Sequence, residues 1–274
     1  MFVNSVDSKT PTSTPIPAAS VILFRRRAGA EDLETFLLRR HRRSSFMSDT
    51  FVFPGGRVES DDGDPETAAI RELFEEAGVL LARGDLSETR RTDWRRRLNA
   101  GEASLGAMIA EESLELDRQS LHLWARWITP SVEPKRFDAY FFLAEVPEGQ
   151  SPSFDQKETV EEAWVTPAEA ISRNDAGQMK LPPPQLRTMT ELLPHSRAST
   201  STLARIADER RQHVHPIMPR LAMLGGNAAL LLPWDPDYAE KGTGEACPMP
   251  PGHLLGTGPS RFILDGAIWR LSSP

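Results

Sequence analysis

The sequence is poor in cysteine: Cys247 is the only one among 274 residues, so the chain can form no internal disulfide. Nothing in cysteine usage therefore points to an oxidising compartment. Long hydrophobic runs are also missing, since no apolar segment approaches the roughly 20 residues that a bilayer-spanning helix needs. Residues 1–17 contain neither an apolar core nor an early basic cluster, so we expect a short disordered lead rather than a signal peptide.

Basic charge is not in excess either. The chain has 32 lysines and arginines against 39 aspartates and glutamates, a formal net charge of −7. Nucleic-acid binding needs a basic face that neutralises phosphates, so this balance argues against such a partner. The histidines, His213 and His215 included, show no spacing typical of a metal site. We therefore expect a cytoplasmic protein with no membrane and no nucleic-acid partner.

Hydrophobic periodicity predicts an α/β domain over residues 18–215. Apolar runs rich in β-branched and aromatic residues predict strands at 18–24, 34–40, 123–130, 136–146 and 161–166. Residues 84–121 are expected to form a mostly helical insertion. After Pro216, the turn segments Gly-Gly-Asn and Asp-Gly lie between apolar runs and predict hairpins. We expect a small β-rich C-terminal extension over 216–274, docked on the main domain.

The best-defined helix is predicted to begin after Asp64 and to end before Gly78. Asp64 is a good N-cap, Pro65 suits the first helical position, and Gly78 suits the residue that follows a helix. The apolar residues within this segment recur at helical spacing and predict a face packed on a sheet; they are Ala69, Ile70, Leu73 and Ala77.

Three glutamates share the last two turns of this predicted helix: Glu72, Glu75 and Glu76. Positions i, i+3 and i+4 lie on one face, where like charges repel and cost stability. Bound Mg²⁺ or Mn²⁺ would turn the same cluster into a favourable hard-oxygen site. Arg71 could hold one carboxylate through a bidentate contact. A solvated acidic helix face is the simpler interpretation, but the preceding Gly-Gly loop favours a metal site.

The run GGRVESDDGDPETAAIRELFEEAGV resembles the signature of the Nudix hydrolases. Its second half, from Arg71 to Val79, fits the family pattern Arg-Glu-aliphatic-x-Glu-Glu-x-Gly-aliphatic completely. Its first half departs, because the position of the family's first glutamate falls on Gly63 and the loop carries an extra residue. Asp61, Asp62 or Asp64 could supply the carboxylate to Arg71 in its place.

The resemblance implies an α/β/α sandwich around a mixed sheet and the metal-dependent hydrolysis of a small-molecule diphosphate. It implies that Glu72, Glu75, Glu76 and the Gly56 carbonyl hold Mg²⁺ or Mn²⁺. The general base in this family is often a glutamate, in the signature or in a later loop. Glu158 is our first choice for it, ahead of Glu161 and Glu162.

Residues 37–56, LLRRHRRSSFMSDTFVFPGG, loosely resemble the signature of Nudix enzymes that cleave coenzyme A. The closer resemblance is to the Nudix type 19 acyl-CoA diphosphatases and their bacterial relatives. It covers roughly residues 18–195 and includes EEAGVLL, RFD and LPPPQ. It implies cleavage of CoA or acyl-CoA to 3′,5′-ADP and (acyl-)phosphopantetheine. The candidate substrate-binding residues are Arg40, Arg42, Arg43, Phe53, Gly55 and Gly56.

Other interpretations stay open at this point. The basic cluster of Arg39, Arg40, Arg42 and Arg43 suits a polyanion but also suits a solvated turn. The substrate could instead be ADP-ribose, NADH or another nucleoside diphosphate derivative. A third hypothesis is a ligand sensor that has the fold but no catalytic activity. Arg136 and Asp138 could form an ion pair that supports a strand end, and a homodimer is left open.

Overall fold

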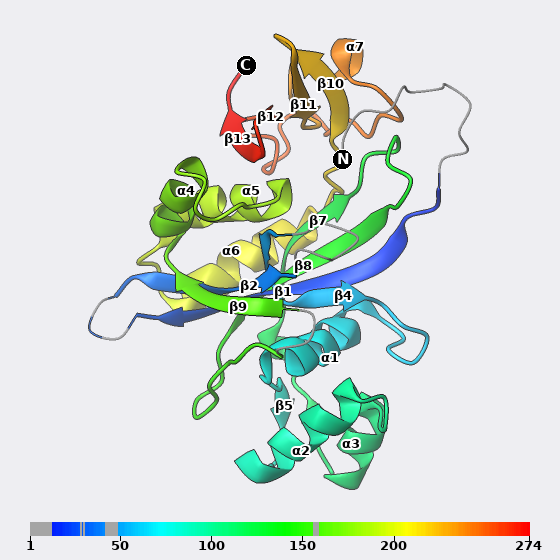
Figure 1. Ribbon diagram of the computed structural model, residues 1–274, viewed down its shortest axis with the longest axis vertical. Helices are drawn as coiled ribbons and strands as arrows, with labels where there is room; N and C mark the ends of the chain where they lie inside the picture. Colours follow the sequence, from blue (N-terminus) through cyan, green and yellow to red (C-terminus); the bar gives the residue numbers. More distant parts are fainter. Residues whose placement is uncertain (1–12, 28, 30, 42–48, 156–158) are drawn as a thin grey trace.

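The computed structural model describes residues 13–27, 29, 31–41, 49–155 and 159–274. In this part of the chain the main body is a seven-stranded mixed sheet (Figure 1). Strand β1 pairs in parallel with β8, and the remaining pairs, β1 with β2 and β4, β2 with β3 and β9, and β7 with β8, are antiparallel. The strands are β1 (Ile16–Arg26), β2 (Leu33–Arg40), β3 (Phe51–Val52), β4 (Gly55–Arg57), β7 (His122–Ile128), β8 (Phe137–Glu145) and β9 (Thr159–Val165).

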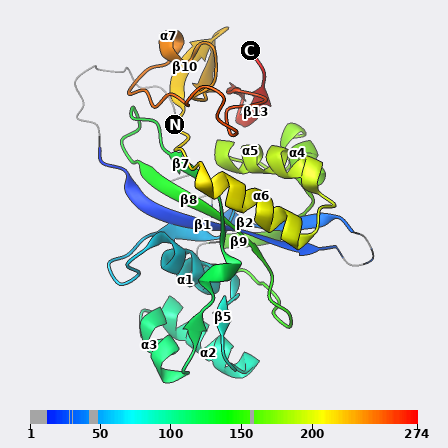
Figure 2. The same cartoon turned by 180° about the vertical axis from the view of Figure 1, so that it is seen from behind.

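Helices cover both faces of this sheet, as Figures 1 and 2 show. Helix α1 (Pro65–Ala77) lies on one face, and α4 (Pro167–Asp175), α5 (Pro183–Leu192) and α6 (Thr200–Gln212) lie on the other. The alternation of a strand builds the two layers. In β2, Phe36 and Leu38 pack into the core beneath α1, whereas Leu37 packs into the core beneath α5. The α/β/α sandwich with a mixed sheet is confirmed.

The segment after α1 is mostly helical, as expected. It contains β5 (Ala82–Arg83), α2 (Glu88–Asn99), α3 (Leu105–Glu111), β6 (Glu115–Leu116) and the 3₁₀ turn η1 (Arg118–Ser120). Strands β5 and β6 pair with each other and close the insertion. The fully buried Trp94 and Met108 join the same hydrophobic core as Phe74 of α1, so the insertion packs beside that helix.

The C-terminal region forms the expected β-rich extension. Its antiparallel sheet has the order β10 (Arg220–Leu224), β11 (Asn227–Leu231), β12 (Arg261–Asp265) and β13 (Ile268–Ser272), and α7 (Tyr238–Lys241) lies in the β11–β12 connection. Leu232 and Phe262 share one core with Leu186 and Met189 of α5. The extension is therefore continuous with the main hydrophobic core, and the short turn η2 (Leu193–His195) follows α5.

The expected disordered lead over residues 1–17 extends too far. Strand β1 begins at Ile16, so the last two residues of the predicted lead belong to the sheet. Pro17 lacks an N–H, but its carbonyl accepts a hydrogen bond from the Val58 N–H. Residues 1–12 lie outside the described part of the chain.

Arg136 and Asp138 do not form the proposed ion pair. Asp138 binds Arg126 of the neighbouring strand at 2.6 Å, because the antiparallel pairing of β7 and β8 brings Arg126 beside it. Arg136 is buried and donates instead to the carbonyls of Thr129 and Ser13. In the described ranges, no helix combines the length and the apolar character that crossing a membrane requires.

One polar network lies within the helical layer opposite α1. Glu191 of α5 accepts bonds from Arg187 at 2.7 Å, from Arg210 of α6 at 2.7 Å and from the indole N–H of Trp124 at 3.0 Å. Arg187 also donates to the carbonyls of Thr257 and Pro259. Burial acts to raise the pKa of Glu191, but the two guanidinium groups hold it below its ordinary value. The network ties the C-terminal extension to α5 and α6.

We predict that Glu191→Gln lowers the free energy of unfolding by about 3–5 kcal/mol, because it leaves two largely buried guanidinium groups without their anion. Urea unfolding at pH 7 measures this change. Glu209→Gln is the matched control, since Arg205–Glu209 has the same i,i+4 spacing but is exposed, and its loss should cost under about 0.5 kcal/mol. The contribution of Glu191 is present above its unfolded-state pKa and is lost as pH falls through its lower folded-state pKa. Equal effects of the two variants would contradict this account.

Candidate active site on helix α1

Local capping chemistry sets both ends of α1. The Asp64 carboxylate accepts a bond of 2.7 Å from the Thr67 N–H, and Pro65 occupies the first turn, where its missing N–H costs nothing. Gly78 follows the helix in the left-handed conformation, with φ of 72°, and its N–H bonds the Phe74 carbonyl. The predicted helix and its caps are confirmed.

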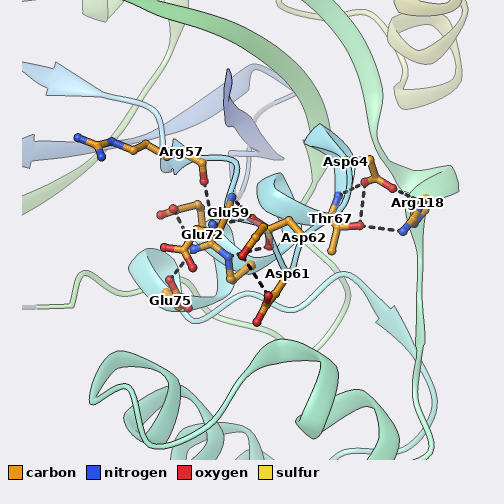
Figure 3. A network of polar contacts seen from close by, with 11 residues as sticks. Arg57, Glu59, Asp61, Asp62, Asp64, Thr67, Glu72, Glu75 and Arg118 are labelled. Carbon is orange, nitrogen blue, oxygen red and sulfur yellow. Dashed lines mark hydrogen bonds and ion pairs between the residues drawn. The ribbon is translucent and has the colours of Figure 1, made fainter. Parts of the chain in front are cut away.

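Arg71 is the centre of a polar network, and three of its partners, Asp62, Glu72 and Glu75, are labelled in Figure 3. Its side chain is buried and makes a bidentate contact with Asp62, at 2.9 Å for each nitrogen–oxygen pair. It also donates to Glu72 at 2.9 Å, to Glu75 at 3.1 Å and to the Arg57 carbonyl at 2.9 Å. The buried guanidinium of Arg71 thus binds three carboxylates.

The structure distinguishes among the three aspartates that sequence left open. Asp62 is the partner of Arg71, and it also accepts a bond of 2.8 Å from the Glu59 N–H, which closes the loop. Asp61 is exposed and bonds Ser60, and Asp64 is engaged as the N-cap. Asp62 is therefore the aspartate that supplies a carboxylate to Arg71.

Burial and charge act in opposite directions at this network. Burial acts to lower the pKa of Arg71, but Asp62, Glu72 and Glu75 more than offset it and hold the pKa above its ordinary value. Burial raises the pKa of Glu75, and Arg71 offsets only part of that effect. The arginine stays charged and available as a permanent counter-ion.

The two glycines before the loop bring the backbone against the glutamates. The Gly55 N–H donates to Glu76 at 2.8 Å. A Cβ at Gly55 would lie 2.3 Å from the Ala19 carbonyl oxygen, and a Cβ at Gly56 would lie 2.3 Å from a carboxylate oxygen of Glu72. Only glycine allows this approach, so the backbone of residues 55–56 and the carboxylates of Glu72 and Glu76 lie side by side.

The donor set suits a hard cation. The carboxylates of Glu72 and Glu76 lie beside the Gly55–Gly56 backbone, and carboxylate and carbonyl oxygens are the ligands of Mg²⁺ and Mn²⁺. As the described side chains stand, no three of His, Cys, Asp or Glu are grouped closely enough to hold a metal ion. Instead, Arg71 binds Glu72 and Glu75, and the Gly55 N–H binds Glu76.

The candidate substrate-binding residues lie in different environments. Arg39 is neutralised by Asp49 at 2.7 Å and Glu161 at 2.9 Å, so it is part of an ion-pair network. Arg40 follows Phe36 and Leu38 at period two and belongs to the α1 face of β2; its Nε is buried and has no partner among the described residues. Phe53 packs against Phe141 in the core. Arg42, Arg43 and Glu158 lie outside the described residues.

Sequence reasoning missed three residues of the insertion that contact α1: Arg95, Asn99 and Arg118. They lie 19 to 54 positions from their partners in a segment with only a generic helical pattern, so no local signal identifies them. The two alternative candidates for the general base lie in strand β9, not in a loop: Glu161 pairs with Arg39, and Glu162 accepts a bond of 2.7 Å from the Phe154 N–H.

Comparisons with known proteins agree with this geometry. A family model described as the NUDT19 Nudix domain matches residues 66–192. A Caenorhabditis elegans relative, named as a nudix hydrolase (number 7), is 34% identical over 193 residues, which cover 66% of this chain and 61% of that protein. The acyl-coenzyme A diphosphatase NUDT19 of Xenopus laevis is 25% identical over 275 residues, covering 76% of this chain and 72% of that protein.

A solved structure shares the fold. The NUDIX hydrolase from Alicyclobacillus acidocaldarius superposes with a TM-score of 0.60 at 24% identity, over 66% of this chain and 91% of that chain. The chain is therefore similar to the Nudix hydrolases in sequence and in fold, in line with the resemblance of its signature. Its family match is to the NUDT19 type, and it spans less than two thirds of the length of the C. elegans relative.

We predict that Asp62→Ala lowers the free energy of unfolding by about 2–3 kcal/mol and weakens Mn²⁺ binding, because Arg71 then depends more on Glu72 and Glu75. Urea unfolding and calorimetric Mn²⁺ titration measure the two effects. Asp61→Ala, one position away and exposed, should change stability by less than about 0.5 kcal/mol. If the two variants behaved alike, Asp62 would not be the anchor.

The two glycines should respond differently to alanine. Gly56→Ala meets only the side chain of Glu72, so we expect a folded protein whose displaced Glu72 binds Mn²⁺ at least about ten-fold more weakly. Gly55→Ala meets the backbone of β1 and should cost about 2 kcal/mol or more of stability. Thermal unfolding and Mn²⁺ titration of both variants separate these outcomes. Unchanged Mn²⁺ affinity in Gly56→Ala would argue against a metal site at Glu72.

Proposed function

We propose that this chain hydrolyses the diphosphate linkage of CoA or acyl-CoA in a reaction that depends on Mg²⁺ or Mn²⁺. The products would be 3′,5′-ADP and (acyl-)phosphopantetheine. The observation that carries the proposal is that Arg71, anchored by Asp62, binds Glu72 and Glu75, while Glu72 lies against Gly56. An acidic helix face with no chemical role would have no need of a buried arginine anchored by a further carboxylate.

Each residue has a role in this proposal. Glu72, Glu75, Glu76 and the Gly56 carbonyl hold the divalent cation. When bound, the cation supplies Lewis acidity at the phosphoryl oxygens and lowers the pKa of a bound water. Arg71 stabilises the clustered carboxylates before the cation binds, and Asp62 keeps Arg71 in place afterwards. Glu158 stays our prediction for the general base, since Glu162 is engaged by the Phe154 N–H.

CoA is favoured as the substrate class by charge and by similarity. Arg40 belongs to the same face of the sheet as α1 and has a buried Nε without a partner among described residues, which suits a phosphate oxygen. The NUDT19 relative of Xenopus laevis is named an acyl-coenzyme A diphosphatase. We also propose a cytoplasmic location, in keeping with the single cysteine. A homodimer is neither favoured nor excluded.

The direct test is a product assay. Purified protein with Mg²⁺ or Mn²⁺ is offered CoA, several acyl-CoAs, ADP-ribose, NADH and a diadenosine polyphosphate, and the products are resolved by mass. We expect 3′,5′-ADP from the CoA compounds, and a fall in kcat of about 100-fold or more in Glu76→Gln, since removal of a metal ligand costs several kcal/mol of transition-state stabilisation.

Arg40→Met separates the substrate classes. We expect KM for CoA to rise about ten-fold, the cost of a charge-assisted hydrogen bond, while Arg205→Met, an exposed arginine of α6, leaves KM unchanged. Cleavage of only ADP-ribose or NADH would overturn the CoA assignment but keep the metal site. Metal binding without any turnover would favour a ligand sensor.

A further inference from the structure

The insertion contacts the end of α1 that carries the glutamates. Arg95 of α2 donates through Nε to the Glu75 carbonyl at 3.0 Å and through Nη2 to the Glu76 carbonyl at 2.6 Å. Asn99, one turn further along α2, donates to the same Glu75 carbonyl at 3.1 Å. Two side chains of the insertion therefore bind the backbone of two candidate metal ligands.

The same guanidinium also binds the segment that leads toward β9. Arg95 donates to the Ser153 carbonyl at 2.8 Å and to its hydroxyl at 3.0 Å, and the Ser153 N–H donates to the Ala77 carbonyl at 2.9 Å. Arg95 thus joins three pieces of chain, namely α2, the end of α1 and residue 153.

Elementary helix chemistry explains why a cation belongs here. The last carbonyls of a helix have no partner within it, and the C-terminus carries partial negative charge. Helix α1 has no basic residue in its own last turn, so Arg95 supplies the charge from another element. Gly78 leaves the space for it, because a Cβ there would lie 2.9 Å from Arg95 Nη1.

The insertion also holds the opposite end of α1, as Figure 3 shows. Arg118 donates to the Asp64 carboxylate and to the Thr67 hydroxyl, each at 2.7 Å. Arg118 is exposed, so this contact contributes less than the half-buried one at Arg95. Both ends of α1 are nevertheless fixed by the segment that follows it in sequence.

We infer that Arg95 is a positioning residue: by fixing the carbonyls of Glu75 and Glu76, it sets the direction in which their carboxylates meet the metal. The inference rests on the proposed function, and it assigns to the insertion a role in metal binding beyond packing. A role in packing alone is the competing explanation, because Trp94 and Leu98 of the same helix already anchor α2 in the core.

The test compares Arg95→Met with Arg96→Met. Arg96 is the neighbouring arginine, exposed and paired only with Asp93 and Glu102. Mn²⁺ affinity is measured by electron paramagnetic resonance, kcat and KM with CoA, and stability by urea unfolding. For Arg95→Met we expect Mn²⁺ to bind about ten-fold more weakly and kcat to fall about ten-fold or more, with KM within two-fold of wild type. Arg96→Met should match wild type in all of them.

Arg95→Lys and Asn99→Ala keep the test decisive if Arg95→Met fails to fold. Lysine retains the charge and can reach one carbonyl, so it should recover part of the Mn²⁺ affinity, and Asn99→Ala should show a smaller loss of the same kind. Wild-type Mn²⁺ affinity in variants that lose only stability would overturn the positioning role. A wild-type protein that binds no Mn²⁺ and cleaves none of the offered diphosphates would instead refute the proposed function.

Discussion

The contact between Arg71 and Asp62 is the interaction on which the site depends. Three glutamates on two turns of one helix repel each other, and Arg71 lowers that cost by binding two of them. A buried guanidinium is itself costly unless it is fully paired. Asp62 and the Arg57 carbonyl complete its hydrogen bonds, so the arginine is held independently of the two glutamates.

The rest of the fold holds this network in place. The apolar face of α1 packs on the sheet, the Gly55–Gly56 backbone approaches from β4, and the insertion binds both helix ends. The opposite face of the sheet has a different role. There the Glu191 network and a shared core join α5, α6 and the C-terminal extension into one support.

Local chemistry was predictable from sequence, and long-range choices were not. The ends of α1 follow from Asp64, Pro65 and Gly78, whose preferences act within one turn. The choice of Asp62 needed the structure, because three aspartates within four positions could reach Arg71 and only the loop closed by the Glu59 N–H orients one of them.

Predictions of contacts between distant segments failed because they also depend on the fold. Asp138 looked like a partner for nearby Arg136, but strand pairing brings Arg126 to it from another part of the chain. The contacts of Arg95 could not be predicted from the sequence, because its partners are backbone carbonyls, which every residue has. The family resemblance supplied what periodicity could not, namely the expectation that the glutamates hold a metal.

The most direct test of the central claim is to locate bound Mn²⁺ by anomalous X-ray diffraction from crystals grown with the ion. The account predicts Mn²⁺ at about 2.1 Å from carboxylate oxygens of the α1 glutamates, with Glu72 and Glu75 released from Arg71 and Asp62 still bound to it. Mn²⁺ found elsewhere, or Arg71 still bridging Glu72 and Glu75 beside the ion, would contradict the account.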